Sequence, residues 1–148
     1  MAPQILVPVD GSPLAAKALG VALEEHPEAA ITVLHVIDPT QPGYSYPIEF
    51  DFDVEPLHGS EAWYERSEEL AAELFEEVDE MAAAYDTSVS TETTVGEPGR
   101  QIVEFASRSN VDQIVIGSHG RRDAERPLLG SVTETIVFRS PVRVLLVR

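Results

Sequence analysis

Residues 117–133 carry residue types at a spacing that could bind an anion. Four small residues mark this segment: Gly117, Gly120, Gly130 and Ser131. Because glycine lacks a Cβ, the main chain can turn sharply and approach a ligand closely at such positions. A short apolar strand is expected before the segment and a helix at its end. The free N–H groups and positive dipole end of a helix N-terminus suit a phosphate or a carboxylate.

The charge of the same segment also indicates an anion. Three of the ten basic residues fall within six positions: Arg121, Arg122 and Arg126. They stand out in a chain with a net charge of −16, so we expect them to contact a negatively charged group. The alternative is a set of exposed ion pairs with Asp123 and Glu125, which would add little stability.

Two polar residues of the segment have structural explanations as well. Ser131 and Glu134 have the spacing of a capping box, in which Ser131 is the N-cap and its hydroxyl accepts the Glu134 N–H. A cap and a phosphate compete for the same N–H groups, so both roles stay open. His119 could be an acid, a base or a ligand, but a lone loop histidine usually has none of these roles. The other three histidines, His35 among them, are too scattered to indicate a metal cluster.

The chain around this segment alternates between strand and helix patterns. We expect strands at 4–9, 30–37, 88–95, 113–116 and 142–147, and helices at about 13–26, 60–85, 100–109 and 132–139. The apolar strands are typical of a parallel sheet buried on both faces, whereas the polar strand at 88–95 indicates a position near the sheet edge. The alternation predicts one α/β domain over 1–148, with a doubly wound parallel sheet and helices on both faces.

Ligands of such sheets bind beyond the carboxyl ends of the strands. The loops after residues 9, 37 and 116 are therefore the candidate positions. Asp10 lies in the first of these loops, where an aspartate can also simply tie a turn. Residues 38–59 show no helical or strand period. They predict a long loop, and we favour a mobile segment over an ordered lid or a partner surface.

Composition limits the classes of protein that fit. With 26 acidic residues against 10 basic ones, the surface should repel nucleic acid and anionic lipid. Many acids with a single lysine favour a salt-rich cytoplasm, and a halophilic source is our hypothesis. Without a long apolar run or a leader pattern, we expect a soluble, cytoplasmic protein that does not contact a membrane. The lack of cysteine excludes disulfides and thiolate chemistry.

Five stretches of the chain resemble the universal stress protein family. The spacing Gly-x2-Gly-x9-Gly-Ser, formed by Gly117, Gly120, Gly130 and Ser131, is similar to the motif of its nucleotide-binding members. The other four stretches resemble the family's first strand and turn, second strand end, third helix start and last strand: 5–12 (ILVPVDGS), 35–38 (HVID), 95–98 (VGEP) and 142–147 (VRVLLV). Together they cover nearly the whole chain.

The resemblance implies a fold, a ligand and a partner. The fold is a Rossmann-like open sheet of five parallel strands in the order 3-2-1-4-5. The partner is a second copy, bound through the last strand at 142–147. The ligand is ATP, or AMP or ADP, with Mg²⁺ or Mn²⁺ on the phosphates.

The resemblance also implies a role for each matching position. Adenine would meet the main chain of Val36, and the ribose would lie near Asp10, with Pro8 and Val9 beside it. The residues along the ribose and phosphates would be Ile116, Gly117, Ser118 and Gly120. Those at the phosphate end would be Gly130, Ser131, Val132 and Thr133. Arg121 joins this nucleotide-binding set on the strength of its charge.

These residues favour a regulatory protein of the stress response that signals through nucleotide occupancy of a homodimer. One alternative is an ATPase, but the segment has no Walker lysine and no evident base beyond His119 or Asp123. We therefore expect at most slow hydrolysis and assign no catalytic residue. A second alternative is a dimer that acts by protein contact without nucleotide, and the intact glycine motif argues against it.

Overall fold

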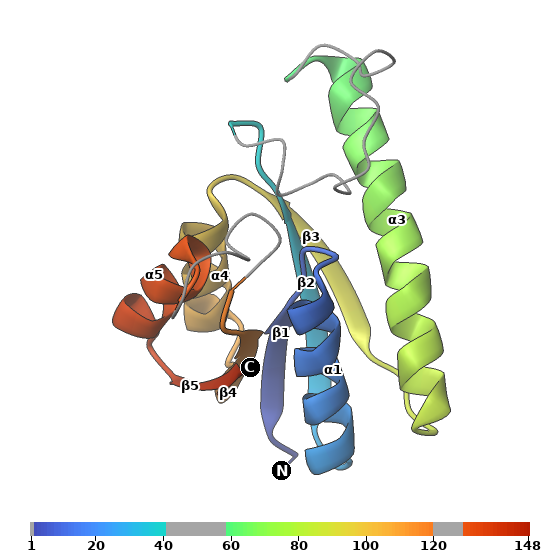
Figure 1. Cartoon of the computed structure of the whole chain (residues 1–148), viewed down its shortest axis with the longest axis vertical. Helices are drawn as coiled ribbons and strands as arrows, with labels where there is room; N and C mark the ends of the chain where they lie inside the picture. The colour runs from blue at the N-terminus through green and yellow to red at the C-terminus, as the bar shows by residue number, and fades with distance from the viewer. Residues whose placement is uncertain (1, 41–58, 120–128) are drawn as a thin grey trace.

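The computed structural model describes residues 2–40, 59–119 and 129–148. Its strands form one sheet in the order β3-β2-β1-β4-β5 (Figure 1), and every pairing is parallel. The strands are β1 (Gln4–Pro8), β2 (Ala30–Ile37), β3 (Ser90–Val95), β4 (Gln113–Gly117) and β5 (Arg143–Val147). The helices are α1 (Pro13–Glu25), α3 (Glu61–Ala84), α4 (Pro98–Arg108) and α5 (Ser131–Arg139). The predicted fold class and strand order are confirmed.

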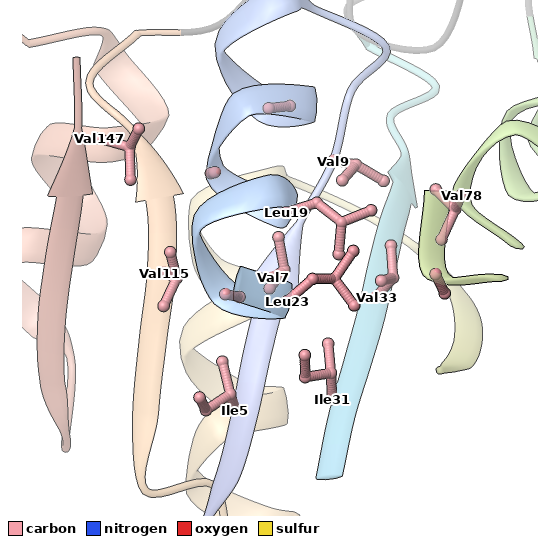
Figure 2. Packing of buried hydrophobic residues seen from close by; sticks show 14 residues of the cluster. Ile5, Val7, Val9, Leu19, Leu23, Ile31, Val33, Val78, Val115 and Val147 are labelled. Atoms are coloured by element: carbon pink, nitrogen blue, oxygen red, sulfur yellow. The ribbon is translucent and has the colours of Figure 1, made fainter. Parts of the chain in front are cut away.

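Helices cover both faces of the sheet because alternate residues of each strand point to opposite sides. Ile5 and Val7 of β1 pack with Leu19 of α1 in a cluster that also includes residues of α3 (Figure 2). Leu6, which lies between them, packs on the other side in a cluster with Ile102 of α4 and residues of α5. Burying one such aliphatic side chain contributes about 1.5–3 kcal/mol. The two clusters therefore hold the sheet between its helix layers.

The long helix α3 is amphipathic, as its pattern predicts. Its buried residues are Trp63, Ser67, Ala71, Val78 and Ala82, whereas its glutamates are all exposed. Trp63 packs against Ile37 at the end of β2. None of the helices in the described ranges is long and apolar enough to cross a bilayer.

Helix starts decide where main-chain N–H groups remain available for a ligand. Ser12 caps α1 and accepts the Ala15 N–H at 3.3 Å, with Pro13 as the first helical residue, as predicted. The expected start of α4 at residue 100 is wrong by two residues. Glu97 is its N-cap, and Pro98 is the first helical residue. The Glu97 carboxylate accepts the N–H groups of Gly99 at 3.0 Å and Arg100 at 2.8 Å, so it replaces the usual serine or aspartate cap.

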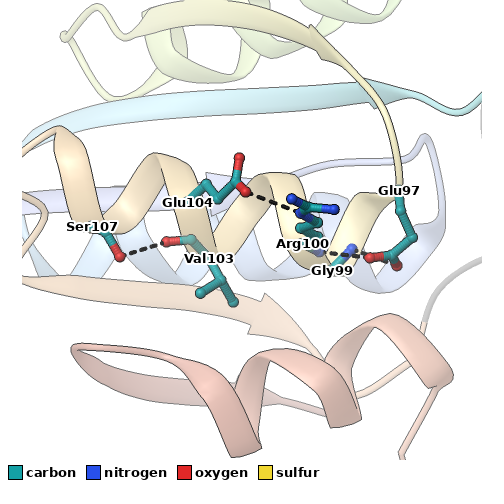
Figure 3. A network of polar contacts seen from close by, with 6 residues as sticks. All are labelled: Glu97, Gly99, Arg100, Val103, Glu104 and Ser107. Carbon is teal, nitrogen blue, oxygen red and sulfur yellow. Dashed lines mark hydrogen bonds and ion pairs between the residues drawn. The ribbon is translucent and has the colours of Figure 1, made fainter.

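Removing this cap should destabilise the fold measurably. We expect Glu97→Ala to lower the free energy of unfolding by about 1 kcal/mol, since two N–H groups of the first turn lose a charged acceptor. Glu104→Ala is the matched control, because Glu104 only pairs with Arg100 at 3.0 Å on the helix surface (Figure 3). An exposed pair of this kind contributes less than about 0.5 kcal/mol. Urea unfolding of both variants checks the cap, and equal losses would contradict it.

Candidate functional site

The sheet has a topological switch point between β1 and β4, which are neighbours in space but distant in the chain. After β1 the chain passes into α1 on one face, and after β4 it leads to α5 on the other face. The two connections leave a crevice at the carboxyl ends of these strands, where ligands of open α/β sheets bind. Val9 and Gly117 border it.

On the β1 side of the crevice, Asp10 holds the turn into α1. Its side chain is only 7% exposed, and Oδ1 accepts the main-chain N–H of Ser12 at 2.9 Å. Gly11 between them has a φ of 80°, a conformation that glycine adopts without strain. The structural explanation for Asp10 is thus confirmed, and its contact with a ribose stays a prediction. Pro8 and Val9, just before it, are buried.

On the β4 side, short hydrogen bonds bring the ends of the predicted segment together. Ser118 donates its N–H to Val147 O at 2.8 Å, and Gly130 donates its own to Ser118 O at 2.8 Å. The Thr133 hydroxyl donates to Gly117 O at 2.8 Å. Because Thr133 is 3% exposed and its hydroxyl proton is used, we expect it to reach a phosphate only through its main-chain N–H. These bonds place the first turn of α5 directly beside the end of β4.

Gly117 has a packing role that the sequence pattern did not indicate. A Cβ added at this position would lie 2.8 Å from Leu14 Cβ and 3.1 Å from the Leu14 main chain. The close approach that this glycine permits is therefore that of α1. Ile116, before it, is buried in the α4 and α5 cluster.

The predicted capping box at Ser131 is wrong. Gly130 is the N-cap of α5, with φ −71° and ψ 163°, and Ser131 is already the first helical residue. Glu134 donates its N–H to Gly130 O at 2.9 Å, which starts the helix one residue earlier than predicted. The bonds from Gly130 and Thr133 to the end of β4 fix this start. Glycine has no side chain, so no N-cap side chain accepts an N–H group of the first turn of α5.

Val36 supplies main-chain groups on the β2 side. Leu34 O accepts the Val9 N–H at 2.9 Å, and Ile37 O accepts the Gly96 N–H at 2.9 Å. Since successive residues of a strand direct their polar groups to opposite neighbours, the N–H and C=O of Val36 face the β1 side. At the level of Val36, β1 has already ended, since its last residue is Pro8. Val36 as a whole is buried, with 0% of the residue exposed.

Sequence reasoning missed His35. This residue is 2% exposed, and its Nδ1 lies 2.8 Å from Val9 O. The available signal was a single imidazole in an otherwise apolar, buried strand. Asp38, the first residue after β2, is also buried and accepts the N–H and the hydroxyl of Thr40 at 2.8 and 2.7 Å.

The structure thus aligns several predicted residues along one edge. Val36, Asp10, Ser118 and the first turn of α5 follow one another across β2, β1 and β4. Two strand spacings span about 10 Å, which suits an elongated ligand with a polar head at one end and an anion at the other. No group of three or more potential metal ligands occurs within the described ranges.

Six residues named in the predictions lie outside the described residues: Gly120, Arg121, Arg122, Asp123, Glu125 and Arg126. The same holds for most of the predicted loop at 38–59, since 41–58 are not described. His119 is described and half-buried. Its chemical role stays open.

Comparison with known proteins identifies the family. The model of the universal stress protein family matches residues 1–148. The chain belongs to that family. Among its relatives, the stress response protein NhaX of Bacillus subtilis is 32% identical over 171 residues, with 99% of this chain and 98% of NhaX covered.

Solved structures of the family have the same fold. The universal stress protein UspA from Lactobacillus plantarum is 27% identical and superposes with a TM-score of 0.77, covering 99% of this chain and 97% of that one. A universal stress protein from Archaeoglobus fulgidus in complex with dAMP is 19% identical, with a TM-score of 0.65 and coverage of 100% and 98%. At that identity, the second likeness shows the fold alone.

Proposed function

We propose that this universal stress protein binds an adenine nucleotide, with ATP as the favoured ligand, along the carboxyl edge of the sheet. One observation carries the proposal. The first turn of α5 starts from a glycine N-cap and is fixed against the end of β4 at the switch point. Its N–H groups and dipole favour an anion.

The rest of the edge suits the other parts of a nucleotide. The ribose would lie near Asp10, beside Pro8 and Val9, and the base would meet the main chain of Val36. Ile116, Gly117 and Ser118 would border the ribose and the first phosphate. Gly130, Ser131, Val132 and Thr133 would surround the terminal phosphates. The same fold holds dAMP in the A. fulgidus protein, which supports the proposal without assigning residues.

We expect binding rather than hydrolysis to be the activity. Fast phosphoryl transfer needs a metal held in place and a residue that orients water. The segment 117–133 has no Walker lysine, and Mg²⁺ or Mn²⁺ would be bound on the phosphates. The protein would then act in the stress response as a regulatory module that responds to nucleotide occupancy.

Calorimetric titration with four ligands tests the binding proposal. In concentrated KCl with Mg²⁺, ATP should bind more tightly than GTP, adenosine or tripolyphosphate, because only ATP has both the matching base and the phosphates. Tripolyphosphate should still bind weakly at α5. No heat with ATP at millimolar concentration would refute the proposal. Phosphate release followed over hours separates a binder from a slow ATPase.

The sheet edges support a homodimer through β5, which is the second part of the proposal. On β5, Leu146 is 37% exposed, and the neighbouring helix α5 presents Phe138 at 79% exposure. The opposite edge strand, β3, is polar and includes the exposed Glu92. A charged edge resists pairing, whereas an apolar edge favours it.

A charge on the apolar edge should therefore prevent dimer formation. We expect Leu146→Glu to be monomeric at concentrations where the wild type is dimeric, because two carboxylates would be buried in the interface. Light scattering after size exclusion measures the mass. Val95→Glu, at an apolar position on β3 that is 50% exposed, is the matched control and should stay dimeric. A dimer in the first variant and a monomer in the second would place the interface at β3.

A further inference from the structure

The imidazole of His35 makes a bond that interrupts the ladder between β1 and β2. Its Nδ1 lies 2.8 Å from Val9 O inside the core. A carbonyl oxygen only accepts hydrogen bonds, so Nδ1 carries the proton and donates it. The side chain of one strand thus binds the last main-chain carbonyl at the end of its neighbour.

Without this bond, the ladder would continue by one more step. Val9 already donates its N–H to Leu34 O at 2.9 Å. In a regular parallel ladder, Val9 C=O would next accept the N–H of Val36. Within the described ranges no main-chain hydrogen bond joins Val9 and Val36. The Val9 carbonyl instead accepts the hydrogen bond from the His35 imidazole. The pairing of β1 with β2 ends at Pro8 and Leu34.

We infer that His35 is a positioning residue for the nucleobase, an inference that rests on the proposed function. By holding Val9 C=O, it leaves the N–H and C=O of Val36 directed toward the β1 side, beyond the last paired residues Pro8 and Leu34. These two groups form a donor next to an acceptor. Adenine presents the complementary pair, an amino donor beside a ring nitrogen, whereas guanine has a carbonyl in place of the amino group. His35 therefore favours adenine over guanine.

Substitution at position 35 tests the inference through base selectivity. His35→Leu cannot donate to Val9 C=O, so this carbonyl becomes available to the Val36 N–H. We expect the ratio of ATP to GTP affinity to fall about tenfold, the scale of one lost hydrogen bond. Tripolyphosphate affinity should not change, because the phosphates bind at α5. A merely structural role would change both affinities together or neither.

A pair of amide variants provides the control for folding. The amide nitrogen of asparagine can take the place of Nδ1, so His35→Asn should keep the wild-type ratio within about twofold. The amide nitrogen of glutamine lies one carbon further out, so His35→Gln should lose selectivity like His35→Leu. If the leucine variant does not fold, the amide pair decides. Equal ratios of ATP to GTP affinity in the two amide variants would overturn the inference. Failure of the wild type to bind ATP would instead refute the proposed function.

Discussion

Replacing Ser131 with aspartate should weaken ATP binding about 100-fold without destabilising the protein. Ser131 is exposed at the first position of α5, so a carboxylate there would face the proposed phosphates. A like-charge contact in a partly desolvated site costs about 2–3 kcal/mol, which corresponds to this loss of affinity. The same carboxylate interacts favourably with the helix dipole, by about 0.3–1 kcal/mol. Stability and affinity should therefore change in opposite directions.

Calorimetry and urea unfolding of Ser131→Asp measure the two effects. Adenosine, which has no phosphate, should bind with unchanged affinity, and its titration is the internal control. Ser131→Asn, which has nearly the same size but no charge, should retain ATP affinity within a few fold. If the aspartate variant bound ATP as tightly as the wild type, the phosphates could not lie at the first turn of α5.

Replacing Gly117 with valine should cost about 3 kcal/mol of folding free energy. Even the first carbon of a side chain would lie 2.8 Å from Leu14 Cβ and 3.1 Å from its main chain. The neighbour is partly main chain, so relief requires α1 to move away from β4, and overpacking of this kind costs about 1–3 kcal/mol or more. The turn after β1 would move with α1. We therefore expect nucleotide affinity to fall in the fraction that remains folded.

Gly20 in the middle of α1 is the matched control for Gly117. A Cβ at this position meets no atom within 4 Å. Gly20→Ala should therefore stabilise the protein by about 0.5–1 kcal/mol, because alanine has the higher helix propensity. Thermal and urea unfolding of both variants compare them directly. If Gly117→Val lowered the free energy of unfolding no more than Gly20→Ala does, the role of Gly117 in packing α1 on β4 would be contradicted.

Most of the fold follows from short-range patterns in the chain. The second strand was predicted with its observed bounds, 30–37, because an apolar, β-branched run has few other stable arrangements. The polar run before residue 95 correctly indicated the edge strand. The strand order came from the family resemblance, since periodicity alone does not fix which strands are neighbours.

The errors lie where tertiary contacts override local rules. Ser131 and Glu134 have the spacing of a capping box, yet bonds from Gly130 and Thr133 to β4 start the helix one residue earlier. Glu97 caps α4 although glutamate is an uncommon N-cap. The role of His35 depends on a carbonyl 26 positions away in the chain. No local pattern contains that information.

The most direct test of the nucleotide site is a map of main-chain amide shifts by NMR as ATP is added. We expect the largest changes at the N–H groups of Val36, Ser118, Val132 and Thr133, which border the proposed site from base to phosphate. Adenosine should reproduce the change at Val36 and leave Val132 and Thr133 nearly unaffected. Changes confined to α3, or no change at millimolar ATP, would contradict the site.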